Sequence, residues 1–413
     1  MNRELIIDSG PSEVLIALLE NKKLVELHRE KNSNTFSVGD IYLGKVKRIV
    51  QGLNAAFIDI GYEKDAFLHY LDLGPQIHSL MKYTKGAVQG KALPLTSNEI
   101  TFDKNIEKSG KISQIIAVNQ EIPVQIAKEP ISNKGPRITS ELAIAGRYLV
   151  LVPFSDRISI SQKIKSSEDR NRLKRLVTSI KPKNFGIIIR TVAENKKVAE
   201  LIADLEDLMQ KWESLVARLG NAKAPKKILS EIDRSSVILR DILNETFNSI
   251  HVNDAAIFDE LRNYIKTIAP EKADIVKYYK GKDPIFEHFG IDKQIRNAFG
   301  KKVYLKNGAY LIIEHTEAMH VIDVNSGHRS NTDNNQEANA MEVNMDAAGE
   351  IARQLRLRDM GGIISIDFID LHVPTNRRML FEKMRLEMDA DHAKHTVLPP
   401  SKFGVVQITR QRV

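Results

Sequence analysis

Two short runs of β-branched residues, each leading into an acid, constrain the fold of this chain more than any other feature. Alternation in the first run favours a strand on which Asp323 and Asn325, two residues apart, share a face. In the second run a glycine pair ends a helix, and isoleucines lead into Asp367 at the end of a strand. We therefore predict two buried strands that each present one acid. The runs are LIIEHTEAMHVIDVNS (residues 311–326) and GGIISIDFID (residues 361–370).

A carboxylate inside an apolar run is costly unless a basic residue or a cation neutralises it. Mg²⁺ takes few protein carboxylates and keeps several waters, so one aspartate from each strand would be a sufficient contribution. No pair of histidines or cysteines in the sequence suggests zinc. The alternative is that Asp323 and Asp367 cap loops or form salt bridges, and the pattern alone leaves both interpretations open.

The composition sets broad limits on the class of protein. A length of 413 residues predicts two to four domains, and a net charge of +8 favours a polyanionic partner. The chain contains no cysteine, which excludes disulfides and thiolate zinc sites within it. The first residues lack a signal-peptide core, and no stretch approaches the length of a membrane span, so we expect a cytoplasmic protein without a membrane partner.

Three segments of the sequence carry a resemblance: VIDVNSG, EIARQLRLRDMGGIISIDFID and ITRQRV. They resemble the motifs of the ribonuclease E/G family of bacterial endoribonucleases. The resemblance implies that Asp323 and Asp367 hold a catalytic Mg²⁺, with Mn²⁺ left open as a substitute, and that Asn325 assists beside them. Glu317, Asp333 and Asp370 match no ligand position of the family and are weaker candidates.

The implied activity is magnesium-dependent hydrolysis of single-stranded RNA to 5′-phosphate and 3′-hydroxyl products. The resemblance also implies stimulation by a 5′-monophosphate on the RNA and a role in rRNA processing and mRNA decay, with rRNA precursors and mRNA as partners. One alternative is a non-catalytic RNA-binding or ribosome-associated protein. A second is a DNA nuclease, since the sequence shows no contact to a ribose 2′-hydroxyl.

The implied fold class is multi-domain α+β. An RNase H-like domain contains an inserted OB-fold barrel and a 5′-sensor domain, and a DNase-I-like catalytic domain follows. We assign no chemistry to the second RNase H-like part, whose helical pattern uses Ile238, Leu239, Ile242 and Leu243. The expected ranges are 1–37 and 236–298 for the RNase H-like domain, 38–140 for the barrel, 141–235 for the sensor and 299–413 for the catalytic domain.

Short strands separated by Gly and Asn signals between residues 38 and 73 predict a small five-stranded barrel. The resemblance makes Phe57 and Phe67 exposed aromatics that stack RNA bases, and Lys134 an RNA contact. The alternative is that both phenylalanines belong to the core of the barrel. Positive charge on the same strands comes from Lys45, Lys47 and Arg48.

Four further positions match the family's pocket for a 5′-monophosphate: Gly146, Val150, Arg190 and Thr191. A guanidinium can hold a phosphate through two hydrogen bonds, a threonine hydroxyl adds a third, and a glycine lets the backbone approach. The alternative is an ordinary salt bridge at the end of a strand.

Several local expectations complete the sequence analysis. The spacing of apolar residues at 197–220 predicts an amphipathic helix. We expect Trp212 in the core and the acids of this helix, including Asp204, in solvent. Residues 75–111 predict a long, basic, mobile loop, and a linker should follow Pro225.

Arginines near the end of the helix before residue 361 suit the helix dipole or a phosphate, and two closing arginines could bind the RNA backbone. They are Arg353, Arg356 and Arg358, then Arg410 and Arg412.

Family members continue past the RQR segment into a cysteine pair that shares zinc between subunits, and then into a small dimerising domain. The sequence here ends at Val413. We therefore expect no zinc site in this chain. The implied homodimer is a weaker expectation for the same reason.

Overall fold

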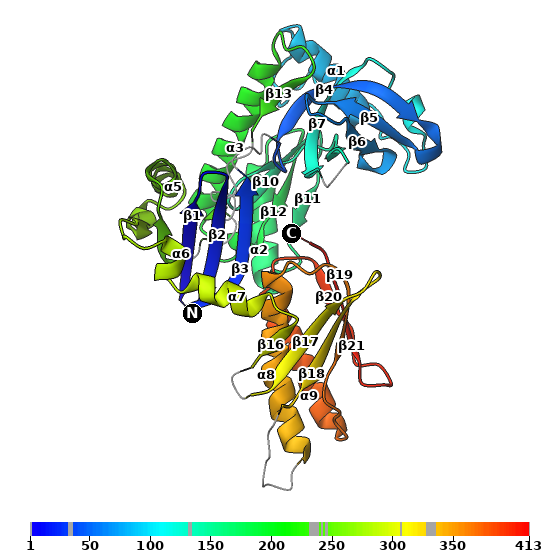
Figure 1. The fold of residues 1–413 in the computed structure, drawn as a ribbon. Coiled ribbons are helices and arrows are strands. Elements are labelled where there is room, and N and C mark those ends of the chain that lie inside the picture. Colours follow the sequence, from blue (N-terminus) through cyan, green and yellow to red (C-terminus); the bar gives the residue numbers. More distant parts are fainter. Residues whose placement is uncertain are drawn as a thin grey trace. The chain divides into compact units, whose positions relative to one another are not determined.

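The computed structural model describes residues 2–31, 36–130, 134–230, 239–240, 243, 247–305, 308–327 and 336–412. The chain divides into two compact units, one formed by Met1–Asn32 with Glu245–Val413 and the other by Ser33–Asn244. Both combine helices with sheets (Figure 1), which confirms a mixed α+β fold.

The first unit contains a five-stranded sheet in the order β15-β14-β1-β2-β3. β1 pairs in parallel with β14, so the start of the chain shares a sheet with residues more than 240 positions later. The predicted hairpin around Asn21 is confirmed, with positive φ at Asn21 and Lys22. Ile238 and Ile242 lie outside the described residues. The elements are β1 (Arg3–Ser9), β2 (Glu13–Glu20), β3 (Lys23–Lys31), β14 (Phe247–Val252), α5 (Ala255–Ile268), β15 (Val276–Tyr278), α6 (Ile285–His288) and α7 (Ile291–Ala298).

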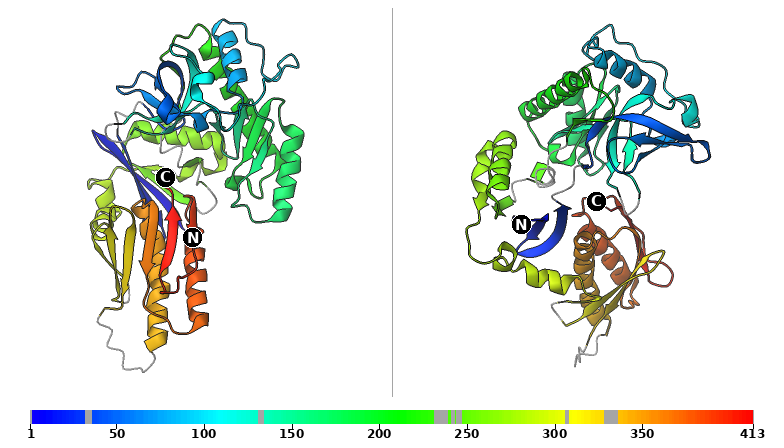
Figure 2. Two further views of the ribbon diagram at one scale, coloured as in Figure 1. Left: turned by 90° about the vertical axis from the view of Figure 1, so that its right-hand side faces the viewer. Right: turned by 45° about the horizontal axis from the view of Figure 1, so that its top comes forward.

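A six-stranded sheet in the order β16-β17-β18-β19-β21-β20 forms the rest of this unit. β18 and β19 are parallel, and helix α8 makes the crossover between them. Helices α8 and α9 lie along one face of the sheet (Figures 1 and 2), where α8 buries Ala347, Ile351 and Leu355. The elements are β16 (Lys302–Tyr304), β17 (Tyr310–His315), β18 (His320–Asn325), α8 (Gln336–Leu357), β19 (Gly362–Asp367), α9 (Pro374–Met388), β20 (His395–Val397) and β21 (Val406–Arg410).

The second unit begins with the predicted five-stranded barrel. Its strands run β4-β5-β6-β8-β7, and a β4–β7 pairing closes the ring. The linker expected after Pro225 is wrong, because these residues form β13 and pair with β4 as an added edge strand. The strands are β4 (Ile41–Val50), β5 (Ala55–Asp59), β6 (Ala66–His69), β7 (Glu121–Lys128), β8 (Arg137–Thr139) and β13 (Lys226–Leu229).

A four-stranded sheet in the order β11-β12-β10-β9 follows the barrel. The predicted amphipathic helix is confirmed as α3, and Trp212 on it is 3% exposed. Its indole packs against Phe185, Phe154 and Tyr83, so Trp212 is a core residue. The elements are β9 (Ile144–Ala145), β10 (Leu149–Pro153), β11 (Ile158–Ile160), α2 (Ser167–Ile180), β12 (Phe185–Ile189) and α3 (Val198–Leu219).

The long mobile loop expected at residues 75–111 is wrong in its first part. Residues Ile77–Val88 form helix α1, which buries Ile77, Leu80 and Ala87. Residues 89–111 form turns and extended chain, and they too are anchored, because Leu95 is buried and the Tyr70 hydroxyl donates to the Glu107 carbonyl. The segment is therefore packed against the barrel and α3.

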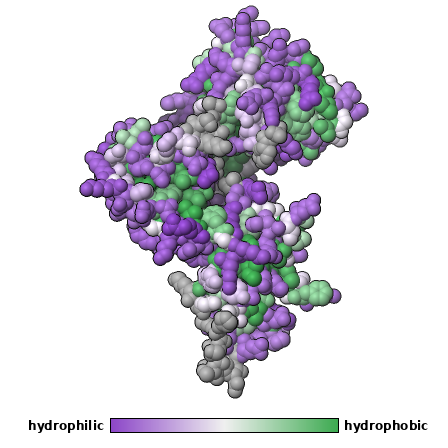
Figure 3. All heavy atoms as spheres, viewed as in Figure 1, coloured by the Kyte–Doolittle hydropathy of each residue, from purple (hydrophilic) through white to green (hydrophobic). Residues whose placement is uncertain are grey.

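Hydrophilic side chains cover most of the visible face of both units (Figure 3). Among the helices of the described residues, none combines the length and apolar character that crossing a bilayer requires. The apolar residues instead fill separate buried clusters, with the barrel and its neighbouring sheet sharing one of them and the six-stranded sheet with α8 and α9 forming another.

Candidate active site

Asp323 and Asp367 are direct neighbours across the β18–β19 pair. The two strands run parallel, and the register places Asp323 opposite Asp367. Both residues lie near the carboxyl ends of their strands, and paired residues of adjacent strands project from the same face. The structure thus brings together two acids that are 44 positions apart in the sequence. Asp323 is half-buried and Asp367 is exposed, and β19 is only partly buried, which corrects the prediction of two buried strands.

The electrostatics of the pair leave room for a cation. Although its side chain is exposed, neighbouring protein atoms partly desolvate the Asp367 carboxylate, and this effect, followed by the negative charges of Asp323 and Asp370, raises the pKa of Asp367. Among the ion pairs of the described residues, none joins a basic side chain to Asp323 or Asp367. Asn325 Nδ2 donates to Asp323 Oδ2 at 2.8 Å and fixes that carboxylate. The salt-bridge alternative therefore gains no support from the described part of the chain.

The chemistry of the donor set fits a hard divalent ion. Two carboxylates and one amide supply oxygen ligands, and Mg²⁺ sites commonly combine one or two carboxylates with waters. Within the described ranges, no group of three or more His, Asp or Glu side chains has metal-site geometry. Of the weaker candidates, Asp370 lies close enough to affect Asp367, Glu317 lies in the turn before β18, and Asp333 lies outside the described residues.

Two helix residues that the sequence analysis missed fix the loop after Asp367. Asn344 of α8 is fully buried, donates to the Ile369 carbonyl at 2.7 Å and accepts from the Ile369 N–H at 3.0 Å. Glu337 accepts from the N–H groups of His372 and Val373, just before α9. For Asn344 the only available signal was a polar residue at a buried helix position, which does not reveal its partner.

The arginines at the end of α8 bind protein groups and not phosphate. Arg353 donates to Glu350 and to the Leu24 carbonyl, Arg356 bridges Glu20 and Glu26, and Arg358 donates to the carbonyls of Ala298 and Gly300. Glu350 lies on α8 itself, and the other partners belong to β2, β3, α7 or the chain that follows α7. These side chains therefore join the two sheets, which corrects the expected phosphate contact.

Arg410 is also buried, so the predicted contact with the RNA backbone is wrong for this residue. Its side chain is 2% exposed and pairs with Asp391, whose side chain is 3% exposed. It also donates to Asp359 Oδ1 at 2.8 Å. Arg412, two residues later, is exposed. Only one of the two closing arginines can reach a ligand.

The barrel places Phe57 and Phe67 side by side. They are opposite each other on β5 and β6, with ring centroids 5.7 Å apart in an edge-to-face arrangement. Both are half-buried and neither belongs to the buried core, so the core alternative is not supported. The Arg48 guanidinium lies over the Phe57 ring at 4.0 Å, whereas Lys47 pairs with Asp59 and Asp65. Lys134 is exposed.

The four predicted sensor residues meet where β10 and β12 adjoin. Arg190 follows β12, and its Nη1 donates to the Gly146 carbonyl at 2.8 Å. Val150 on β10 lies opposite Ile188 on β12. The Thr191 hydroxyl is 2.8 Å from the Ser161 hydroxyl. The structure therefore brings the four positions together without assigning them a ligand.

Asp204, expected in solvent, instead holds the chain between Gly146 and Val150. Its carboxylate accepts from the N–H groups of Arg147, Tyr148 and Leu149 at 2.8–2.9 Å. A Cβ at Gly146 would lie 2.7 Å from Asp204 Oδ1, so this close approach requires glycine.

Comparisons with known proteins show the family of the chain. The family model described as Ribonuclease E/G family matches residues 143–413. The chain belongs to the ribonuclease E/G family. The resemblance noted in the motifs is thereby confirmed, and so is the enzyme class that it implied, an endoribonuclease.

Individual ribonuclease E/G relatives extend this match to the whole chain. Ribonuclease G of Escherichia coli K12 is 33% identical over 416 residues, covering 100% of this chain and 80% of the relative. Ribonuclease G of Haemophilus influenzae is 35% identical, covering 99% and 79%. Ribonuclease E of Synechocystis is 36% identical over 91% of this chain and 52% of the relative. The chain is thus similar to both named branches of the family.

Proposed function

We propose that this chain is a magnesium-dependent endoribonuclease that cuts single-stranded RNA and leaves 5′-phosphate and 3′-hydroxyl ends. Asp323 and Asp367 hold the metal, and Mn²⁺ can replace it. The observation that carries the proposal is the in-register pairing of these two acids, without a basic partner among the described residues. A cytoplasmic location, rRNA and mRNA substrates and the domain ranges predicted from the sequence belong to the same proposal.

The residues around the acid pair have distinct tasks in this reaction. Bound Mg²⁺ would supply Lewis-acid chemistry at the scissile phosphate and activate water for the attack. Asp323 is held for this task by the Asn325 amide, which donates to it at 2.8 Å. The Asn325 oxygen accepts a hydrogen bond from the water or orients the phosphate. Asn344 fixes the chain after Asp367 and so limits the movement of the second carboxylate.

RNA recognition belongs to the second unit. Phe57 and Phe67 offer two half-exposed rings, and base stacking on aromatic faces tolerates many sequences. Lys134 adds a phosphate contact. Arg190 and Thr191, with Gly146 and Val150, bind the 5′-monophosphate of the substrate, because a guanidinium and a hydroxyl provide donors to phosphate oxygens. A 5′-monophosphorylated RNA is therefore cut faster than a 5′-hydroxyl RNA.

The test is cleavage of a 5′-monophosphorylated, A/U-rich single-stranded RNA with Mg²⁺ and with EDTA. Asp323→Asn and Asp367→Asn keep the size of each side chain and remove its charge. Each should lower the cleavage rate at least ~100-fold, because the metal loses one of two carboxylates. Glu317→Gln is the matched control, since it removes an exposed carboxylate in the turn at the other end of β18. It should cleave as the wild type does.

Other outcomes would favour the rival functions. RNA binding without cleavage in Mg²⁺ or Mn²⁺ would support a non-catalytic RNA-binding protein. Equal cleavage of a matched single-stranded DNA would support a nuclease that does not read the ribose. Full activity of both asparagine variants would reject the assigned metal site.

A further inference from the structure

Two adjoining cavities lie beside α9, and one of them reaches the loop that follows Asp367. The first, of about 450 Å³, lies between α9 and the loop from β20 to β21, and Phe381 and Pro399 contribute to its wall. The second, of about 330 Å³, reaches the chain from Phe368 to His372, which directly follows Asp367. Both volumes lie in the range of sites for small ligands. The residues that line both cavities are Arg377, Pro400, Lys402 and Gly404.

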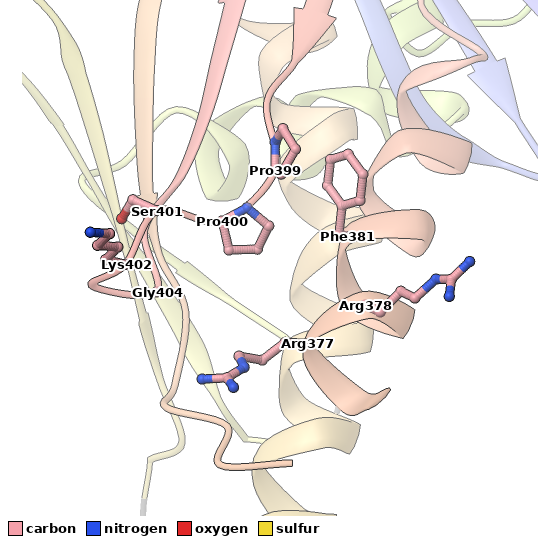
Figure 4. Close-up of a pocket in the computed structure, with 8 residues that line it drawn as sticks. All are labelled: Arg377, Arg378, Phe381, Pro399, Pro400, Ser401, Lys402 and Gly404. Carbon is pink, nitrogen blue, oxygen red and sulfur yellow. The ribbon is translucent and has the colours of Figure 1, made fainter. Parts of the chain in front are cut away.

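The two cations shared by the cavities differ from three arginines of the same unit that hold protein groups. Within the described residues, no ion pair or side-chain hydrogen bond involves Arg377 or Lys402, whereas Arg353, Arg356 and Arg410 are all paired with acids. Figure 4 shows Arg377 extending from α9 to the side on which the loop carries Lys402 and Gly404. Arg378 lines only the first cavity and extends to the other side. A positive site therefore lies beside the loop that follows Asp367.

An exposed aromatic side chain lies beside these cations. Phe403 is 89% exposed and lines the second cavity. The turn that presents it is ordered, because the Phe403 N–H donates to Ser401 Oγ and the Gly404 N–H donates to the Ser401 carbonyl. Such exposure of a phenylalanine costs solvation free energy, which stacking on a flat ligand would recover.

We propose that this groove, defined by Arg377, Lys402 and Phe403, binds one nucleotide of the RNA strand next to the bond that is cut. The inference rests on the proposed function and adds a substrate subsite to it. Arg377 and Lys402 bind the phosphate, and Phe403 stacks on the base.

The charges at the two ends of the groove determine where the phosphate lies. Asp370 lines the second cavity and repels an anion there, close to Asp367. The first cavity has two arginines, one lysine and no acid in its lining. The phosphate therefore lies in the first cavity, and the base reaches toward Phe403 at the edge of the second. The strand continues from there to the acid pair.

The experiment measures binding separately from cleavage. A 3′-labelled, 5′-monophosphorylated A/U-rich RNA is titrated with the full chain in EDTA, where no cutting occurs, at several salt concentrations. Arg377→Gln/Lys402→Gln should weaken binding about tenfold, because two charge-assisted contacts are lost. The slope of log K against log salt should become shallower by about 0.7, the contribution of one neutralised phosphate in a single strand.

A double variant with the same charge change is the matched control. Arg385→Gln/Lys266→Gln removes two exposed cations of the same unit that line neither cavity, and it should bind as the wild type does. Phe403→Ala should weaken binding about fivefold or more, and Phe403→Trp should restore it, because base stacking on an aromatic ring contributes ~1–3 kcal/mol per base.

Each outcome decides between the two proposals. An unchanged affinity and salt slope in Arg377→Gln/Lys402→Gln would overturn the groove, even if the wild type cleaves RNA with Mg²⁺. Weaker binding in this variant, together with a wild type that never cleaves, would keep the groove as an RNA site and reject the proposed catalysis. Equal losses in the control variant would show a general charge effect and would also overturn the groove.

Discussion

Replacing Arg410 with methionine should destabilise the sheet that carries the acid pair. The guanidinium donates to Asp391 through Nε (2.6 Å) and Nη2 (3.2 Å), and through Nη1 to Asp359 (2.8 Å) and the Met360 carbonyl (3.1 Å). These contacts join the end of β21 to the turn after α8 and to the chain before β20. Methionine preserves most of the volume and removes every donor.

The size of the effect follows from the burial of the pair. Removing one partner of a buried ion pair costs about 3–5 kcal/mol, because the other charge stays buried. The Asp391 carboxylate also accepts from the Ala393 N–H, so part of its stabilisation persists. We therefore expect the free energy of unfolding to fall by about 3 kcal/mol, the lower end of this range. Opening of the sheet should become about 100-fold more frequent.

Hydrogen exchange measured by mass spectrometry would detect the loss of stability in the strands that Arg410 holds. Peptides from β19 and β21 should lose protection, since Arg410 lies opposite Gly362 in the β19–β21 ladder. The only tryptophan of the chain, Trp212, lies in the second unit, so its fluorescence serves as an internal control. Arg412→Gln removes an exposed arginine two residues away and should change neither signal.

A different result would restore the interpretation made from the sequence. If Arg410→Met left exchange unchanged and weakened RNA binding, the side chain would be an RNA contact and the buried pair would be unimportant. If exchange rose as expected, the double variant Arg410→Met/Asp391→Leu should recover part of the stability, because it removes the buried charge as well as its partner.

The remaining predictions concern the sensor and the response to acid. Arg190→Ala should abolish the preference for 5′-monophosphate over 5′-hydroxyl RNA and leave cleavage of 5′-hydroxyl RNA intact, as single-turnover rates on the two substrates would show. Burial favours the neutral form of Glu26, but the hydrogen bond from His28 and the charge of Arg356 outweigh it and lower the pKa of Glu26 to about 2. This carboxylate therefore stabilises the fold fully above about pH 4.5, and the stabilisation is lost as the pH falls toward 2. Urea unfolding between pH 6 and pH 3 should show the loss.

Matched variants separate these effects from general damage. Arg157→Ala removes an exposed arginine of the second unit and should keep the preference for a 5′-monophosphate. An equal preference ratio in Arg190→Ala and the wild type would reject the sensor. Glu26→Gln should be less stable at pH 6, with a shallower dependence on pH. If its unfolding free energy had the same pH slope as the wild type, Glu26 would not be the responsible group.

The sequence predicted those features that follow from the spacing of apolar residues within one strand or helix. Alternation of apolar and polar residues around Asp323 predicts the strand and the shared face of Asp323 and Asn325. Apolar residues at spacings of three and four predict the helix around Trp212. Helix α1 was missed because its buried face mixes Ile77 and Leu80 with Ser79 and Thr84, which weakens the periodic signal. Register between distant strands has no local signal, so the family motifs and not the pattern suggested that Asp323 meets Asp367.

The partners of charged side chains were the least predictable feature. Arg356 binds Glu20 and Glu26, which lie 336 and 330 positions away in the sequence. Asp204 follows the pattern of a solvent-facing helix acid, yet it accepts three backbone N–H groups from residues 147–149. Both residues are charged side chains on helices that carry other charged residues. The sequence alone therefore does not distinguish a charge that binds another part of the protein from one that binds a ligand.

In the unit that carries the acid pair, the protein partners of each cation separate structural charges from those that can bind a ligand. A guanidinium that is already held by buried carboxylates, as in Arg356 and Arg410, would have to break those contacts to bind RNA, at a cost of several kcal/mol. Arg377 and Lys402 have no such pairing among the described residues and line a cavity next to the loop that follows Asp367. The net charge of +8 indicates that the chain can attract a polyanion. The unpaired cations determine where the strand can be held once it arrives.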